Sequence, residues 1–262
     1  MSDRPVILEY THDGRAARLT LNRPNKNNAI DRALLETLTA QIEDIERAND
    51  VRVVTVRGAG GTFSAGADLA ELKGTIEDGD RAGAAAFLDL IHETLDRLAA
   101  VTVPTVAIVE GFALAGGLET MLACDLTICS RDATLGDQHA NFGLVAGGGG
   151  TQRLPRIVGP RRAKELIFTG RRLSPVEAKE WGLVNRVADP DDLDDAIEDL
   201  VDILAEKSGR AAGVAKYLVD RGADLDMETG LELEREQVCS YMFEDDAKEG
   251  LRAFADGRAP EF

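Results

Sequence analysis

The chain has 262 residues, and its 47 acidic and 30 basic side chains give a formal net charge of -17 at pH 7. A polyanion of this kind lacks the basic surface that nucleic acids require, which excludes a nucleic-acid-binding function. No apolar run approaches the roughly 20 residues of a membrane span, and the first residues lack the apolar core of a signal peptide. We therefore expect a cytoplasmic protein of one large domain, or one domain with an appendage, and no membrane partner.

The chain has too few cysteines and histidines for a disulfide framework or a metal cluster. The cysteines are odd in number, which favours reduced thiols over disulfides: Cys124, Cys129 and Cys239. The histidines are scattered along the chain: His12, His92 and His139. Because no Cys/His cluster has the spacing of metal ligands, we expect no metal site.

The acidic residues are spread along the chain, with a dense run from Asp189 to Asp195. Two explanations remain open. One is adaptation to a salt-rich cytosol, where ions screen the self-repulsion of the surface; the other is a merely acidic, well-hydrated surface. If the first holds, we expect the melting temperature to rise from low to molar KCl. A thermal-melting series in KCl measures this, and a melting temperature that does not rise favours the second explanation.

The N-terminal third predicts strands and one amphipathic helix. Val6–Leu8 and Ala17–Leu21 are expected strands, joined by a turn at His12–Gly14 and followed by a polar loop over 21–28. Asp31 is placed to cap a helix whose apolar residues recur at helical spacing: Leu34, Leu35, Leu38, Ile42 and Ile45. The next strand is expected at Val51–Val56, and the glycines of 58–61 end it.

A first turn of small residues follows, Phe63-Ser-Ala-Gly-Ala-Asp-Leu69. Small side chains allow a ligand to reach the backbone, and Asp68 can cap the next helix start. A helix over about 82–100 then leads to Thr105–Val109, a nearly all-apolar run that is typical of a strand buried on both faces.

A second glycine-rich turn opens a helix from Gly116 to about Ala123. The unpaired N–H groups of a helix start carry partial positive charge, and they can hold a developing oxyanion. Glu119 lies one turn into this helix, where a carboxylate could serve as a general acid or base. The alternative is a glycine-rich turn with a glutamate that only offsets the helix dipole.

The remaining sequence predicts two more strands and then mostly helices. Leu126–Cys129 and Ala133–Leu135 are expected strands, and Gly136–Gly143 is a polar loop. Further helix starts are expected at Thr151, as a cap, and at Ser174-Pro-Val-Glu177, a capping box with Pro at its first position. Helices follow over 191–206, 210–220, 228–243 and 245–256, and we expect them to cover the core or a neighbouring subunit. The alternation of strands and helices predicts an α/β layered core.

Several of these segments resemble the crotonase superfamily, the enoyl-CoA hydratase/isomerase family. They occur in family order over nearly the whole chain: Leu21–Lys26, Phe63–Leu69, Gly111–Glu119, Cys124-Asp125, Gly149–Pro155, Leu166–Gly170, Ala178–Val184 and Asp246–Leu251. The resemblance implies a crotonase-like ββα spiral core over residues 1–190. It also implies a C-terminal helical region over 191–262 that packs in trimers, often as a hexamer of two trimers.

The resemblance also implies a coenzyme A thioester substrate, with no further cofactor. The backbone N–H groups of Ala67 and Gly116 match the family's oxyanion hole, and Glu119 matches its first catalytic glutamate. The resemblance also assigns substrate or CoA contacts to residues of the first turn, to two cations and to one aromatic residue: Ala65, Asp68, Leu69, Arg23, Lys26 and Phe142. The family often has a lysine at the position of residue 70, which is Ala here, and Lys73 is a possible substitute for it.

The second catalytic glutamate of the hydratases falls on His139, which is the main departure from the family pattern. His139 could replace the missing acid or base, because imidazole titrates near neutral pH; Asp137, two residues earlier, could serve instead, or His139 could have a structural role. The position that carries aspartate in aryl-CoA dehalogenases falls on Gly147, which argues against that chemistry. Three functions stay open: an enoyl-CoA hydratase in which Glu119 and His139 share proton transfer, an isomerase or thioester hydrolase on the same scaffold, and a CoA-thioester binding protein with little catalysis.

Overall fold

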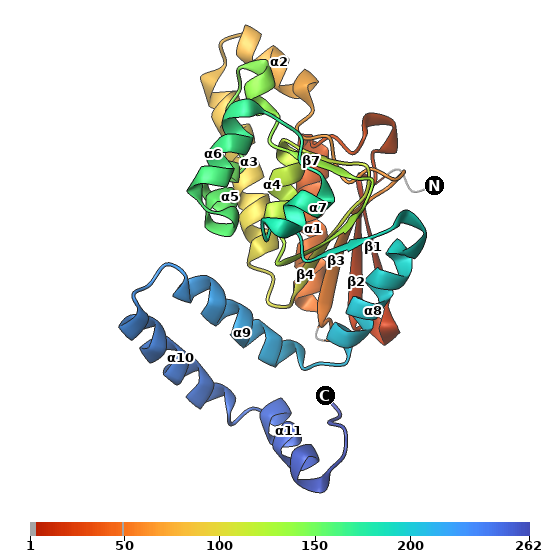
Figure 1. Ribbon diagram of the computed structural model, residues 1–262, viewed down its shortest axis with the longest axis vertical. Helices are drawn as coiled ribbons and strands as arrows, with labels where there is room; N and C mark the ends of the chain where they lie inside the picture. The colour runs from red at the N-terminus through yellow and green to blue at the C-terminus, as the bar shows by residue number, and fades with distance from the viewer. Residues whose placement is uncertain (1–3, 49) are drawn as a thin grey trace.

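The main sheet has six strands in the order β1-β2-β3-β4-β6-β8 (Figure 1). The structure, a computed structural model, describes residues 4–48 and 50–262; the first three residues, on which the expected absence of a signal peptide partly depends, lie outside the described part. The first two strands pair antiparallel, and every later neighbour pairs parallel. The strands are β1 (Val6–Thr11), β2 (Ala16–Leu21), β3 (Val53–Gly58), β4 (Thr105–Val109), β6 (Leu126–Ser130) and β8 (Arg186–Ala188).

A second row of extended segments accompanies the main sheet. Strand β5 (Phe112–Leu114) pairs parallel with β7 (Thr134–Gly136). Single parallel bridges join Ser64 to Ala113 and Ile30 to Ala67. Successive windings of the chain therefore add a strand to the main sheet and an extended segment to this second row, which confirms the predicted α/β spiral.

Eleven α-helices are present in the described part of the chain. They are α1 (Arg32–Arg47), α2 (Leu69–Glu77), α3 (Arg81–Ala99), α4 (Gly116–Leu122), α5 (Gly150–Val158), α6 (Pro160–Thr169), α7 (Pro175–Glu180), α8 (Leu193–Ala205), α9 (Gly209–Gly222), α10 (Met227–Tyr241) and α11 (Asp245–Asp256). A short 3-10 helix, η3 (His139–Phe142), lies between β7 and α5. No helix of the described part combines the length and apolarity that crossing a membrane requires.

The inner strands β3, β4 and β6 are largely buried on both faces because both faces of the sheet are covered. Strand β4 is buried at all five positions, as its sequence predicts. On one face, α1 packs its five predicted apolar residues into the larger core cluster. On the other face, Leu193, Ile197 and Val201 of α8 pack against strand residues that include Val53 and Ile128.

Three predicted helix caps are confirmed, one of them without its capping box, and a fourth is wrong. Asp68 accepts a hydrogen bond from the Ala70 N–H at 3.2 Å and caps α2. Asp31 accepts a hydrogen bond from the Leu34 N–H at 2.8 Å and begins α1. Ser174 caps α7, but the Glu177 carboxylate pairs with Arg171 at 2.7 Å instead of completing a capping box. Thr151 is not the cap of α5, because that helix begins one residue earlier, at Gly150.

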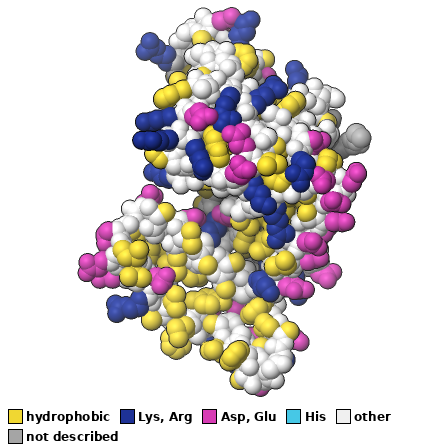
Figure 2. All heavy atoms as spheres, viewed as in Figure 1, with side chains coloured by type: hydrophobic (Ala, Val, Ile, Leu, Met, Phe, Trp, Pro, Cys, Tyr) yellow, Lys and Arg dark blue, Asp and Glu magenta, His cyan; other side chains and the backbone are white. Residues whose placement is uncertain are grey.

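The C-terminal helices α9, α10 and α11 extend away from the sheet as an arm (Figure 1). Lys216 of α9 anchors this arm, since its ammonium lies 2.8 Å from the Asp125 carboxylate and its side chain is 10% exposed. Hydrophobic side chains gather over the arm (Figure 2), and several are more than half exposed: Val219, Met227, Leu231, Met242, Phe243, Leu251 and Phe254. The domain boundary at residue 190 stays a prediction. Helix α8, which lies beyond this boundary, packs against the sheet, whereas no residue of the arm belongs to that core cluster.

Candidate active site

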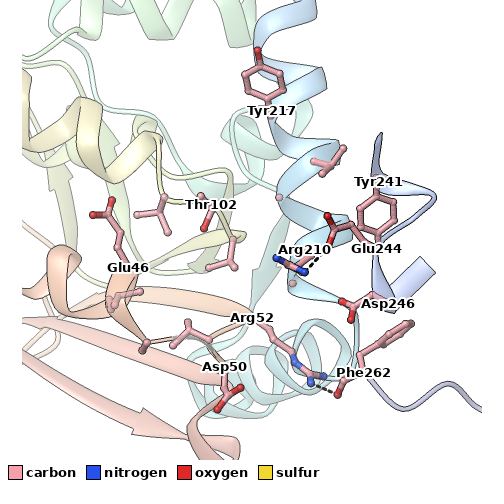
Figure 3. A pocket seen from close by; sticks show the side chains of 18 of the residues that line it. Glu46, Asp50, Arg52, Thr102, Arg210, Tyr217, Tyr241, Glu244, Asp246 and Phe262 are labelled. Carbon is pink, nitrogen blue, oxygen red and sulfur yellow. Dashed lines mark hydrogen bonds and ion pairs between the residues drawn. The ribbon is translucent and has the colours of Figure 1, made fainter. Parts of the chain in front are cut away.

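Seven of the predicted site residues line a cavity of about 330 Å³, and Arg23, Lys26, Asp68, Lys73 and Asp137 do not. Those that line it are Ala65, Ala67, Leu69, Gly116, Glu119, His139 and Phe142. Helix α3 supplies much of the apolar wall, through Phe87, Leu88, Ile91 and Leu95. A larger cavity of about 760 Å³ lies between the core and the C-terminal arm (Figure 3), and none of the predicted site residues lines it.

Two backbone amides from separate glycine-rich turns meet at the cavity. In the bridge between Ile30 and Ala67, the hydrogen bonds use the carbonyl of Gly66 and the N–H of Asp68, each at 2.8 Å. This pattern leaves the N–H of Ala67 itself directed away from Ile30. A Cβ atom placed on Gly116 would lie only 3.2 Å from the Ala67 nitrogen, so the two turns are in contact. Within the described residues neither amide donates a hydrogen bond, as an oxyanion hole requires.

Ala115 has a strained backbone directly before the second of these amides. Its φ of 48° and ψ of -119° lie in a region that glycine favours. Such a conformation costs on the order of 1–3 kcal/mol at a non-glycine residue. These backbone angles set the orientation of the peptide group that carries the Gly116 N–H at the start of α4.

We expect Ala115→Gly to relieve this strain. Glycine adds freedom to the unfolded chain, which offsets part of the gain, so the net increase in unfolding free energy is about 1 kcal/mol. Chemical denaturation measures it. An unfolding free energy that falls would contradict strain at this position.

Glu119 is buried, and two amides fix one of its oxygens. The N–H groups of Gly148 and Gly150 donate to Oε1 at 2.7 and 2.8 Å. Oε2 has no hydrogen-bond partner among the described residues. Every fully buried side-chain oxygen in that part of the chain has a partner, so Oε2 is not fully buried and is open to the cavity. Burial raises the pKa of Glu119 above its ordinary value, and the two N–H donors and His139 oppose this shift. The carboxylate is therefore held with one free oxygen facing the site, as a general base requires.

His139 lines the same cavity as Glu119, and its imidazole is held by Asp137. The imidazole Nδ1 is 3.1 Å from Asp137 Oδ1, and the Asp137 side chain is only 1% exposed. Burial lowers the pKa of His139, but the hydrogen bond and charge of Asp137, together with Glu119, raise it above its ordinary value. Asp137 does not line the cavity; it contacts His139 from behind.

The cations predicted to bind CoA lie outside the cavity, and their role stays a prediction. Arg23 is engaged within the fold: its guanidinium lies 2.9 Å from Asp31 and 3.0 Å from Asp68. This clamp ties the start of α1 to the turn that carries Ala67. Lys26 is exposed, and Lys73 forms a 3.7 Å ion pair with Glu77 on the surface of α2.

Sequence reasoning missed the partners of Glu119 and most of the cavity wall. In the sequence, the glycines of 147–150 stand directly before the helix start expected at Thr151, and nothing in them indicates contact with Glu119. A Cβ atom at Gly148 or Gly150 would lie 2.9 or 3.0 Å from a Glu119 oxygen, so both positions need glycine for the close approach of the carboxylate. The α3 wall has the helical spacing of ordinary core residues, and no sequence signal separates it from them. Within the described residues no group of three or more potential ligands could hold a metal ion.

Two free amides, a buried carboxylate and an imidazole around one apolar cavity are the groups that an enzyme needs to stabilise an oxyanion and transfer protons. Comparison with known sequences agrees with this class. The model of the family described as enoyl-CoA hydratase/isomerase matches residues 12–262. The chain belongs to this family, within the crotonase superfamily, and transforms acyl-CoA thioesters.

Individual relatives cover nearly the whole chain. The short-chain-enoyl-CoA hydratase of Clostridium acetobutylicum is 36% identical over 259 residues, covering 98% of this chain and 96% of the relative. Enoyl-CoA hydratase domain-containing protein 2, mitochondrial, of Homo sapiens is 37% identical over 249 residues, covering 93% and 84%. The crystal structure of an enoyl-CoA hydratase from Bacillus anthracis superposes with a TM-score of 0.93 at 35% identity and covers 98% of both chains.

Proposed function

We propose that the protein adds water reversibly across the double bond of a 2-enoyl-CoA thioester. The observation that carries this proposal is the arrangement of two proton-transferring groups, Glu119 and His139, on the same cavity as the free amides of Ala67 and Gly116. An isomerase needs only one such group for a 1,3-proton shift, whereas hydration uses one to activate water and another to protonate carbon. The names of the relatives given above also support hydration.

In this proposal the thioester carbonyl accepts hydrogen bonds from the two amides. Glu119 Oε2 takes a proton from water, the water oxygen bonds to the β-carbon, and the π electrons move to the carbonyl oxygen as an enolate. The amides stabilise that charge, by about 3–4 kcal/mol for each donor. The enolate collapses as His139 gives a proton to the α-carbon. A proton then passes from Glu119 to His139 through solvent, which restores both groups.

Three assays separate the candidate reactions. With crotonyl-CoA we expect the absorbance of the conjugated enoyl thioester to fall as water adds. Isomerisation of a 3-enoyl-CoA would raise this absorbance, and hydrolysis would release a thiol. Binding of a CoA ester with no change in any assay would replace hydration with a binding function.

His139→Ala should lower the hydration kcat by about 10²-fold or more, because the imidazole transfers a proton. Steady-state kinetics with crotonyl-CoA measure the change. His92→Ala is the matched control, since His92 is exposed on α3 and does not line the cavity. A loss of less than tenfold in His139→Ala would assign that residue a structural role.

The assembly and location are proposed on separate grounds. We propose a homotrimer or homohexamer built through the C-terminal arm, because its exposed apolar side chains exceed what a monomer surface usually carries in one place. The CoA end of the substrate is proposed to contact Lys26 and Lys73. We also propose a cytoplasmic location, which the free thiols of Cys124, Cys129 and Cys239 support, since such thiols are typical of reducing compartments.

A further inference from the structure

We propose that Asp137 is a positioning residue that makes the acid of this site an imidazolium. Its carboxylate holds His139 with Nδ1–H bonded to Oδ1 and with Nε2 open to the cavity. This inference rests on the proposed hydration and specifies which proton-bearing atom faces Glu119.

The local backbone fixes the pair. Asp137 directly follows β7, and His139 begins η3. The His139 backbone N–H donates to the Asp137 carbonyl at 2.8 Å and lies 3.3 Å from Asp137 Oδ1. The same Oδ1 is 3.1 Å from the imidazole Nδ1. An ionised carboxylate only accepts hydrogen bonds, so Nδ1 carries hydrogen whether the ring is neutral or charged.

The other imidazole nitrogen is therefore the one that titrates. Nε2 has no hydrogen-bond partner among the described residues. Every fully buried side-chain nitrogen in that part of the chain has a partner, so Nε2 is not fully buried. The His139 side chain is 13% exposed, and the residue lines the cavity with Glu119. Nε2 thus reaches the space that the substrate would occupy.

The charges around His139 favour its cation. Asp137 faces it from the end of β7, and Glu119 faces it from α4. Arg172 also lines the cavity, with its guanidinium over the Phe112 ring at 5.9 Å from the centroid. Helix α6 packs against η3, and its Glu165 is paired with Arg171 at 2.9 Å. Burial lowers the pKa of His139, but by less than Asp137 and Glu119 together raise it.

The proton on His139 Nε2 is the one that is transferred to the substrate. Nε2–H of the imidazolium breaks as the α C–H bond forms, and the ring is left neutral with Nδ1–H still bound to Asp137. Asp137 takes no proton itself. Without the carboxylate, the neutral ring can adopt the other tautomer, with hydrogen on Nε2, and the cation loses its nearest counter-charge.

Nitrogen NMR of the histidine rings in the intact protein tests this placement without any substrate. We expect the neutral His139 ring to carry its hydrogen on Nδ1, and its pKa to fall by about one unit or more in Asp137→Asn. His139→Gln identifies the signal. Asp195→Asn, which removes a charge from an exposed position on α8, is the matched control and should leave the pKa of His139 unchanged.

The pH profile of crotonyl-CoA hydration gives the second readout. The alkaline limb of kcat/KM reports loss of the His139 proton, so in Asp137→Asn it should move down by about one pH unit or more, and activity should fall about tenfold more at pH 8 than at pH 6. Asp137→Glu should restore part of the alkaline limb.

The outcomes distinguish this inference from the proposed function. A neutral His139 ring with hydrogen on Nε2 in the unmodified protein would overturn the positioning role, even if Asp137→Asn failed to fold. An alkaline limb and a ring titration that do not move in a folded Asp137→Asn would also overturn it. Absence of hydration, with the ring tautomer and titration as expected, would instead remove the proposed reaction and leave the placement of His139 supported.

Discussion

Glu119→Gln should lower the hydration kcat by about 10³-fold while the affinity for a CoA thioester stays within a few fold. The amide oxygen of glutamine can accept the same hydrogen bonds from Gly148 and Gly150 as Oε1 does, so the cavity keeps its shape. What is lost is the free oxygen that removes a proton from water. Steady-state kinetics with crotonyl-CoA and direct binding of a CoA ester measure the two effects.

The same substitution should not destabilise the protein. Because the folded-state pKa of Glu119 is raised, its ionisation opposes folding, and stability is lost as pH rises from the unfolded pKa through the folded pKa. Glutamine does not ionise, so the melting temperature at neutral pH should be equal or higher. Glu93→Gln, on the exposed face of α3, is the matched control. Retained turnover in Glu119→Gln would show that another group is the base.

Gly66→Ala should lower kcat by about 10²- to 10³-fold, the usual effect of losing one oxyanion donor. Gly66 has a φ of +105°, and an added Cβ would lie 2.9 Å from both the Leu114 carbonyl oxygen and the Ala115 Cβ. Backbone atoms cannot yield like the end of a flexible side chain, so the two turns must separate. The Ala67 amide then moves away from the Gly116 amide.

Kinetics and circular dichroism together check this expectation. The loss should appear mainly in kcat, because the amides act on charge that develops during the reaction. Gly74→Ala is the matched control, since nothing lies within 4 Å of its added Cβ in α2. Wild-type kcat in a folded Gly66→Ala protein would show that the close contact of the two turns is not needed for catalysis.

Sequence patterns predicted the elements that carry strong periodicity or burial. Helix α1 follows from its leucine and isoleucine spacing with Asp31 before it, and β4 follows from five consecutive apolar or small residues. The two glycine-rich turns were also predicted, because in each of them small residues lie directly before an expected helix start. In each case the signal comes from residues close together in the chain.

The features that were missed depend on contacts between distant segments. Strands β5 and β8 have only three residues each, which is too short for any alternation to be visible. The hydrogen bonds from Gly148 and Gly150 to Glu119 join residues about 30 positions apart. The pairing of Asp137 with His139 is local, but only the geometry shows that Asp137 lies behind the imidazole and not in the cavity.

The parallel sheet has a consequence for how the chain folds. Only β1 and β2 are joined by a short turn; β3, β4, β6 and β8 each pair with a strand from which a longer stretch of chain separates them. Loop-closure entropy must be overcome before such contacts form, so refolding should be slow, with the β1–β2 hairpin forming early. The amides at 67 and 116 meet only after these long-range pairings are complete. Recovery of enzymatic turnover should therefore lag behind the recovery of helical signal during refolding.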